Sequence, residues 1–349
     1  MIHIDELLKQ AVASEASDIH LSVGSPPIFR IHGNLERIGN EELMSEQTES
    51  MAKYLLAKRW DEFLEEREYD FAYELEGVSR FRMNIFHQKR AISLAARVIQ
   101  DNIPSIEQLQ LPNILQKVMT RPHGLVLVTG PTGSGKTTTL AAMIDYVNRT
   151  MNKHIITLED PIEYIHEHGQ SVVQQREVGI DTNAFSNGLR AALRQDPDVI
   201  LVGEMRDLET IQTAITAAET GHLVLATLHT NSAAQTITRI IDVFPPHQQE
   251  QIRIQLSSVL EAVVSQRLLR RADRPGRIAA TEILVSHPSI ANLIRNNKID
   301  QIRNVLQTSR SLGMHTLSMS IQELLNQGII SHEQAKPYLT TVGDFDGNV

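Results

Sequence analysis

The sequence contains no cysteine, and this absence removes several kinds of chemistry at once. Disulfide bonds, cysteine-containing zinc sites and thiol catalysis are excluded, and a reducing compartment is permitted. Basic residues are also scarce, since 33 Lys and Arg face 42 Asp and Glu and leave a formal net charge of −9. An acidic chain without a local basic channel binds nucleic acid poorly, so we expect no nucleic-acid partner and disfavour a DNA translocase.

Long hydrophobic runs are missing as well. A helix that crosses a bilayer needs about 20 apolar residues in succession, and no such run exists. The longest notable uncharged stretch, Thr220–Thr238, is broken by glycine, histidine, asparagine, serine and glutamine. The segment Met1–Lys9 carries Asp5 and Glu6 and lacks an apolar core, so it does not resemble a signal peptide. The sequence therefore predicts a soluble protein without membrane insertion.

What the chain does contain is a phosphate-binding motif at Gly130–Thr137, Gly-Pro-Thr-Gly-Ser-Gly-Lys-Thr, which fits G-x-x-x-x-G-K-[ST]. The apolar run Leu125–Thr129 predicts a buried strand before it, and Thr138–Val147 has its apolar residues on one helical face. In this order, backbone N–H groups and a helix N-terminus close around phosphate oxygens. Lys136 then reaches the β- and γ-phosphates, and the Thr137 hydroxyl ligates Mg²⁺. The expected nucleotide-binding residues are Gly130, Pro131, Thr132, Gly133, Ser134, Gly135, Lys136, Thr137 and Thr138.

The residues before this motif read differently from those after it. Residues 1–98 mix helical spacing with alternating segments typical of neighbouring antiparallel strands, and so predict a small α+β domain. Residues 99–112 contain two prolines and little periodicity, which favours a linker.

Residues 113–341 alternate strand-like with helical segments, an order that predicts an α/β domain with a doubly wound parallel sheet. From about residue 246 to 341 the spacing of apolar residues is mostly helical and predicts a helical C-terminal subdomain. One of its helices is expected over 248–269. The polar tail, 342–349, is expected to be disordered.

Two acidic clusters follow predicted strands of this domain. In the first, Glu159–Glu163, Glu163 or Glu159 can polarise an attacking water, because open α/β sheets bind ligands at the carboxyl ends of their strands. A solvated acidic turn explains the same cluster equally well. In the second, Asp198–Asp207, Glu204 follows a glycine just beyond an apolar strand, which resembles a Walker B strand without its usual terminal Asp. Asp207 is explained more simply as a helix N-cap.

Two histidines, His222 and His229, flank the apolar segment Leu-Val-Leu-Ala-Thr-Leu. A strand between them places them at its opposite ends, so they do not have the spacing of a two-histidine metal site. A structural role is the default for either one. Their setting beside a nucleotide-binding strand favours a role for at least one in sensing phosphate or a neighbouring subunit.

Four arginines, Arg80, Arg82, Arg90 and Arg97, lie on the strands predicted before the linker. On a single domain they are surface charge, which is where arginine is usually found. If subunits form a ring, one or two of them can enter a neighbour's site as arginine fingers.

These segments together resemble one family, the type II/type IV secretion ATPases. The segments that carry the resemblance are Ala16–Leu21, Gly130–Thr137, Thr157–Glu163, Asp198–Asp207 and Gly221–Thr230. The last four resemble the family's Walker A, Asp box, atypical Walker B and His box, and the resemblance covers nearly the whole chain. It implies a hexameric ring in which each subunit has a PAS-like N-terminal domain and a RecA-like ATPase domain, with ATP and Mg²⁺ bound between them.

The resemblance also implies roles for single residues. Lys136 and Thr137 bind phosphate and Mg²⁺, Glu163 is the general base, and Glu204 acts at the metal or the water. The same resemblance places His222 and His229 in the His box and makes Arg82 and Arg97 the arginines that act in trans, with Arg80 less well supported.

Within the family, the chain resembles the retraction ATPases of type IV pili. Its single short N-terminal domain and the impossibility of a four-cysteine zinc element distinguish it from assembly ATPases. Ser289–Asn296 resembles the retraction motif A-I-R-N-L-I-R-E and is followed by Ser311–Leu317, although Ala291 replaces an arginine and Asn296 a glutamate. The resemblance implies an ATPase that powers pilus retraction and twitching motility.

That reading implies a homohexamer located in the cytoplasm, peripheral at the cytoplasmic face of the inner membrane. Its expected partner is an inner-membrane pilus platform protein (PilC-like). Two alternatives stay open from the sequence. One is a pilus or competence-pseudopilus assembly ATPase, and the other is a nucleotide-sensing interaction module that binds ATP without productive turnover.

Overall fold

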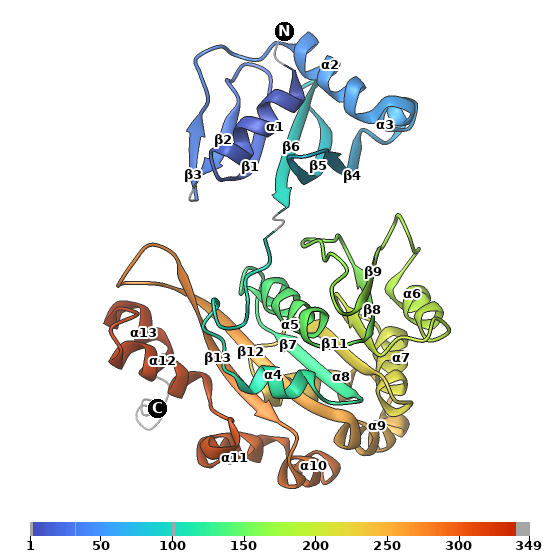
Figure 1. The fold of residues 1–349 in the computed structure, drawn as a ribbon, viewed down its shortest axis with the longest axis vertical. Coiled ribbons are helices and arrows are strands. Elements are labelled where there is room, and N and C mark those ends of the chain that lie inside the picture. Colours follow the sequence, from blue (N-terminus) through green and yellow to red (C-terminus); the bar gives the residue numbers. More distant parts are fainter. Residues whose placement is uncertain (1–2, 32, 100–101, 340–349) are drawn as a thin grey trace, which may run out of the picture. The chain divides into compact units, whose positions relative to one another are not determined.

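A computed structural model describes residues 3–31, 33–99 and 102–339, and within these residues the chain forms two compact units (Figure 1). The first unit holds the described chain up to Asn102 together with Glu163–Ile165. The second unit holds the rest of the described chain.

The first unit is an antiparallel sheet with helices packed on one face. Its strands follow the order β3-β2-β1-β6-β5-β4. The elements are α1 Ile4–Ala13, β1 Ala16–Leu21, β2 Ile28–Ile31, β3 Asn34–Arg37, α2 Ser45–Leu56, a 3₁₀ turn Ala57–Arg59, α3 Trp60–Glu66, β4 Glu68–Leu75, β5 Ser79–Gln88 and β6 Ala91–Ile99. Side chains alternate along β5, so that Phe81 and Met83 join Leu8 and Phe63 of the helices in the core while Arg82 is exposed on the other face.

The second unit is built on a seven-stranded sheet in the order β13-β12-β7-β11-β10-β8-β9. All neighbours are parallel except β12 and β13. The elements before the strand pair β12–β13 are α4 Ile114–Met119, β7 Gly124–Thr129, α5 Lys136–Thr150, β8 His154–Glu159, β9 Val172–Glu177, α6 Phe185–Ala192, β10 Val199–Val202, α7 Leu208–Glu219, β11 Leu223–Leu228, α8 Ala233–Asp242 and α9 Pro246–Val259. The remaining elements are β12 Leu260–Arg270, β13 Arg277–Val285, α10 Pro288–Arg295, a 3₁₀ turn Ile299–Gln301, α11 Ile302–Thr308, a 3₁₀ turn Arg310–Leu312, α12 Leu317–Asn326 and α13 His332–Leu339.

Helices cover both faces of this sheet (Figure 1). Along β7, Val126 and Val128 pack in the cluster formed with α4 and α5, while Leu125 and Leu127 pack in the cluster formed with α7, α8 and α9. All six residues of β7 and all six of β11 are buried, as expected for parallel strands covered on both sides. The predicted α/β fold with a doubly wound sheet is confirmed. The PAS-like character of the first unit stays a prediction.

One expected element is wrong. The helix expected over 248–269 ends at Val259, and the chain continues as the strand β12. This strand pairs in parallel with β7 and antiparallel with β13, and its Val263 and Val264 are fully buried. Tertiary pairing with β7 thus overrides an apolar spacing that a helix also satisfies. The region from 246 to 341 therefore contributes two strands to the sheet besides its helices.

The predicted linker, tail and lack of a membrane-spanning helix can also be compared with the fold. Ile106 and Leu111, in the segment expected to be a linker, are buried in the core of the second unit. The expected disordered tail, 342–349, lies outside the described residues. Among the described residues, no helix is long and apolar enough to cross a bilayer.

Candidate nucleotide-binding site

The phosphate-binding loop connects β7 to α5 through a backbone that only glycine tolerates at several points. Gly130, Gly133 and Gly135 have φ angles of 145°, 76° and 87°. A Cβ atom on Gly130 would lie 2.4 Å from the carbonyl oxygen of Gln266, so this position also lacks room for a side chain. Helix α5 begins at Lys136, immediately after the loop, and its first N–H groups have no partner inside the helix. This is the geometry that receives an anion.

Lys136 lies across the loop that precedes it. Its Nζ atom donates to the carbonyl oxygens of Gly130 at 2.9 Å and Pro131 at 3.1 Å. Thr137 and Thr138 occupy the first turn of α5 and are half-buried, while Thr132 is exposed. Ser134 is 3% exposed, and its Oγ has no hydrogen-bond partner among the described residues. The loop thus gathers a cation and several hydroxyl groups at one helix N-terminus.

Glu204 lies just beyond the carboxyl end of β10, where it meets two basic side chains. Its Oε1 atom is 2.6 Å from Nε of Arg206 and 3.2 Å from Nε2 of His229. Partial burial raises the pKa of the Glu204 carboxyl, but Arg206 and His229 outweigh burial and hold that pKa below its ordinary value. Glu204 is therefore ionised at neutral pH and able to bind a metal ion or accept a hydrogen bond from water.

The loop, Glu204 and His229 lie at the same edge of the sheet, the one formed by the carboxyl ends of its parallel strands. The strand β11 lies between β7 and β10, and all three run in parallel, with Leu228 opposite Thr129 and Ala226 opposite Val202. Their carboxyl ends therefore meet at the edge where open α/β sheets bind ligands.

His222 lies at the other end of β11 from His229, as the sequence predicts. It precedes β11, and its carbonyl oxygen accepts from the N–H of Gly124 at the start of β7. Its Nδ1 lies 2.9 Å from the carbonyl oxygen of Ala217. The full length of β11 separates His222 from the loop, which agrees with the prediction that the two histidines lie at opposite ends of this strand. The role of His222 in the His box stays a prediction.

The first acidic cluster divides into two environments. Glu159, the last residue of β8, is 7% exposed, and its Oε1 accepts from Thr157 Oγ1 at 2.6 Å and Gln175 Nε2 at 3.1 Å. These bonds give Glu159 a structural role and do not support it as the residue that polarises water. Glu163 is exposed and belongs to the segment that groups with the first unit. Its role as general base stays a prediction.

Three arginines of the first unit, Arg30, Arg97 and Arg82, form a row with Asp18 across the exposed sheet face. Arg97 lies opposite Asp18 on one side and opposite Arg82 on the other. Asp18 binds Nε of Arg97 at 2.9 Å and lies 3.7 Å from Nε of Arg30. Opposed like charges are unfavourable on a sheet, and one carboxylate offsets only part of this repulsion. The row thus carries three guanidinium groups and one carboxylate. Arg80 is half-buried, whereas Arg90 lies in the turn after β5, away from the row.

A sequence profile described as Type II/IV secretion system protein matches residues 1–336. The chain belongs to this family. The resemblance drawn from its motifs is thereby confirmed.

Individual members of the secretion family lie close to this chain. It is 49% identical to the type IV pilus retraction ATPase PilT of Pseudomonas aeruginosa over 337 residues. This match covers 95% of this chain and 97% of that protein. It is 50% identical over 311 residues to a twitching motility protein of Neisseria gonorrhoeae, covering 89% of this chain and 83% of that protein. A crystal structure of the pilus retraction motor PilT with bound ADP matches with a TM-score of 0.91 and 46% identity, covering 97% of both chains.

Sequence reasoning missed two charged partners of the candidate site residues. Arg206, which binds Glu204, stands two residues after it, and that spacing was the only local sign of a pair. Asp18, which binds Arg97, stands within the N-terminal family segment Ala16–Leu21, but no role followed from the sequence. A partner far away in sequence becomes visible only when β1 and β6 are paired.

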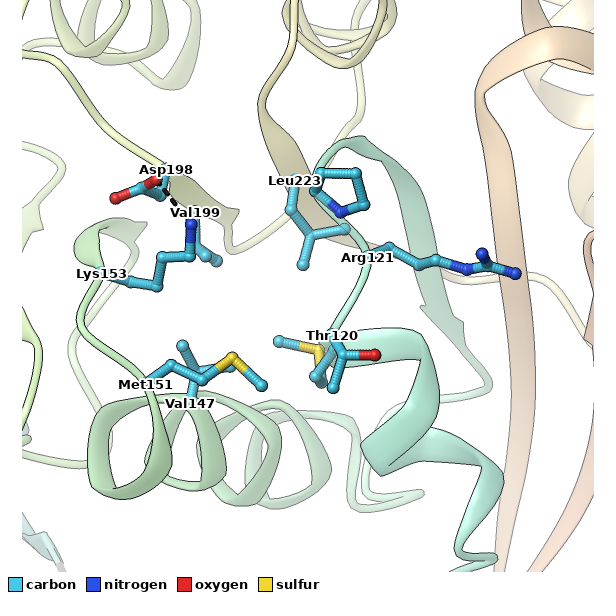
Figure 2. A pocket seen from close by; sticks show the side chains of 10 residues that line it. Thr120, Arg121, Val147, Met151, Lys153, Asp198, Val199 and Leu223 are labelled. Carbon is cyan, nitrogen blue, oxygen red and sulfur yellow. Dashed lines mark hydrogen bonds and ion pairs between the residues drawn. The ribbon is translucent and has the colours of Figure 1, made fainter.

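A small cavity of about 140 Å³ lies at the opposite edge of the sheet, near the starts of β10 and β11 (Figure 2). Lys153 points toward Asp198 and forms an ion pair of 2.9 Å with it, while Arg121 points away. Because Val199 and Leu223 line it, the cavity is far from the phosphate-binding loop. It is not part of the candidate nucleotide site.

Proposed function

We propose that this secretion ATPase hydrolyses ATP and, as a homohexameric ring, powers the retraction of type IV pili and twitching motility. The observation that carries the proposal is the meeting of the phosphate-binding loop, Glu204 and His229 at one sheet edge. Its support comes from a relative of nearly the same length that is named a pilus retraction ATPase. A structure of PilT with bound ADP supports the nucleotide.

The residues present fit ATP with Mg²⁺. The glycine-rich loop leaves room for phosphate oxygens, Lys136 supplies positive charge, and Thr137 offers a hydroxyl oxygen. No group of three or more histidine or carboxylate side chains that could hold a metal occurs in the described part of the chain. The Thr137 hydroxyl and the Glu204 carboxylate form a donor set that suits Mg²⁺, which uses one or two protein oxygens and takes its other ligands from phosphate and water. Glu204 would hold the metal or its water, and Mg²⁺ would neutralise charge on the phosphates.

The remaining catalytic roles complete the proposal. Glu163 acts as the general base that orients the attacking water. Arg82 and Arg97 of a neighbouring subunit stabilise the transferred phosphoryl group, as arginine fingers do. Their row on the exposed face of the first unit supports this role. His229 orients Glu204 through the contact at 3.2 Å.

Mechanical work follows when a subunit changes shape with its nucleotide. If ATP binding and hydrolysis change the shape of each subunit in turn, the succession of changes around a ring displaces whatever the ring holds. The proposed load is an inner-membrane pilus platform protein (PilC-like), which places the ring at the cytoplasmic face of the inner membrane. The acidic balance of the chain disfavours nucleic acid as the load.

The proposed ATP hydrolysis is tested by incubating the purified full chain with ATP and Mg²⁺ and measuring the phosphate released. Wild type should turn over, and Glu204→Gln should bind nucleotide but release little phosphate. Equal rates would contradict the assignment of Glu204. A nucleotide-sensing module would bind ATP without turnover in either form. Native mass spectrometry of the same sample, with nucleotide present, should show a hexamer, and a monomer at micromolar concentration would overturn the ring.

A null mutant of the host tests the direction of the motor. Loss of twitching with retained or excess surface pili supports retraction. Bald cells support the assembly ATPase alternative, for which the departures Ala291 and Asn296 in the C-terminal motif leave room.

A further inference from the structure

Strand β12 carries a glutamine that touches the phosphate-binding loop although it lies far from it in sequence. Gln266 is 3% exposed, and both ends of its amide are bonded. Nε2 donates to the carbonyl oxygen of Ser134 at 2.8 Å, and Oε1 accepts from Oγ1 of Thr139 at 2.8 Å. Only one orientation of the amide satisfies both partners, because a carbonyl oxygen can accept but not donate. We propose that Gln266 is a positioning residue that sets the backbone of the phosphate-binding loop for nucleotide.

The bond to Ser134 controls a neighbouring N–H group. The carbonyl of Ser134 and the N–H of Gly135 belong to one peptide unit, and in a planar trans peptide these groups point in opposite directions. Holding the carbonyl of Ser134 toward β12 therefore turns the N–H of Gly135 away from β12. This N–H belongs to the backbone that a phosphate-binding loop offers to phosphate oxygens. Gln266 thus acts on phosphate through the loop and does not need to touch it.

Two glycines of the loop show how closely β12 approaches. A Cβ atom on Gly135 would lie 2.8 Å from Nε2 of Gln266, and one on Gly130 would lie 2.4 Å from the carbonyl oxygen of Gln266. Side chains longer than hydrogen at either position would push the loop away from the strand. Gln266 therefore limits the side-chain size at both the start and the end of the loop.

The other bond ties Gln266 to helix α5. Thr139 is 1% exposed in the first turns of α5, so its hydroxyl has no access to water as a substitute partner. Loss of the amide would leave a buried hydroxyl and a buried carbonyl without partners, which is unfavourable. The amide therefore fixes the loop relative to the helix whose N-terminus receives phosphate.

The same strand also reaches the segment that follows His229. Arg267, on the opposite face of β12, donates from Nη2 to Oδ1 of Asn231 at 2.8 Å. Successive residues of β12 thus contact the phosphate-binding loop and the His229 segment. The strand that sequence analysis assigned to a helix connects both parts of the nucleotide site.

The inference rests on the proposed nucleotide-binding function, and ADP affinity of the purified full chain tests the two separately. Isothermal titration calorimetry with Mg²⁺ and ADP is run on wild type, Gln266→Leu, Gln266→Glu, Thr139→Val and Thr139→Ser. Thr281→Val is the matched control, since Thr281 lies opposite Gln266 on β13, is 2% exposed and bonds to His315 instead of the loop.

We expect Gln266→Leu to weaken ADP binding by about tenfold, which corresponds to one lost buried hydrogen bond at about 1.4 kcal/mol per factor of ten. Gln266→Glu should weaken it as much, because a carboxylate oxygen then faces the carbonyl of Ser134. Thr139→Val should weaken ADP binding, and Thr139→Ser, which keeps the hydroxyl, should restore it to within about twofold of wild type. Thr281→Val should leave ADP affinity unchanged. The melting temperature without nucleotide identifies variants that are folded.

Affinity within twofold of wild type in folded Gln266→Leu and Gln266→Glu would overturn the inference. An equal loss in Thr281→Val would overturn it too, because the effect would then belong to packing around β12 as a whole. If Gln266→Leu does not fold, Gln266→Glu and the Thr139 pair decide the matter alone. Failure of wild type to bind ADP would instead overturn the proposed function itself.

Discussion

The Nε2 atom of His229 lies 3.2 Å from Oε1 of Glu204, and the two residues follow neighbouring parallel strands, β11 and β10. The same oxygen is held by Arg206 at 2.6 Å. A carboxylate with two such partners has a fixed orientation as well as a lowered pKa. The carboxylate of the second acidic cluster thus has basic partners, whereas Glu159 of the first is buried and accepts hydrogen bonds from a threonine and a glutamine.

The contact between His229 and Glu204 predicts different results for the two histidines. His229→Ala should lower turnover by about tenfold to a hundredfold, as the loss of a residue that orients a ligand usually does, while ADP affinity stays unchanged. His222→Ala should also leave ADP affinity unchanged, because His222 lies at the opposite edge of the sheet. Phosphate release and ADP titration measure the two effects. A weaker ADP affinity in His222→Ala would contradict its placement away from the loop.

Lys136 predicts the clearest loss of activity. Lys136→Ala should lower ATP turnover by about a hundredfold or more, because the charge that stabilises the phosphates is removed. Arg149→Ala is the matched control, since Arg149 is a cation near the far end of the same helix and pairs with Asp145. Steady-state phosphate release should separate the two variants. Undiminished activity in Lys136→Ala would refute the phosphate-binding reading of the loop.

The basic row on the first unit predicts a defect in hydrolysis without a defect in binding. Arg97→Ala should retain ATP affinity and lose most of its turnover, because an arginine finger acts on the transition state. Arg37→Ala, an exposed arginine on the edge strand β3, should behave as wild type. Mixing Arg97→Ala subunits with Lys136→Ala subunits should restore part of the activity if Arg97 acts in trans. No recovery in such mixed rings would contradict that role.

His166 predicts a dependence of stability on pH. It is 8% exposed with no partner for Nδ1 among the described residues, and burial lowers its pKa to about 4 although Asp145 opposes the change. The unfolded chain therefore binds more protons than the folded chain between pH 6.5 and about 4. This contribution to stability is complete above pH 6.5 and falls by on the order of 3 kcal/mol as pH drops through that window.

Urea unfolding at pH 7 and pH 5 measures this contribution. Wild type should lose more free energy of unfolding than His166→Gln, since only the wild-type imidazole must stay neutral when folded. The difference between the two proteins isolates His166 from the other titrating groups. Identical losses would show that His166 is not kept neutral by the fold.

Several features followed from neighbouring residues in the sequence. The loop at Gly130–Thr137 was identifiable because the glycines, the lysine and the flanking strand and helix are contiguous, and their chemistry depends on local backbone conformation. The α/β fold followed from alternating apolar segments. The helix cap Asp207, which accepts from the N–H of Thr210 at 2.8 Å, was equally local.

The features that sequence reasoning got wrong or missed depend on distant partners. Residues 260–270 have an apolar spacing that suits a helix or a strand, and only pairing with β7 and β13 makes them a strand. The contact between His229 and Glu204 likewise exists only because β10 and β11 pair.

The sequence by itself determined that this chain has a phosphate-binding loop in an α/β domain, because residues adjacent along the chain carry that information. The tertiary structure alone decided which groups stand around the loop. Gln266 lies under the loop because β12 pairs with β7, and Glu204 meets His229 because β10 pairs with β11. Strand pairing joins residues that are far apart along the chain, so the spacing of residues in the sequence cannot encode these contacts.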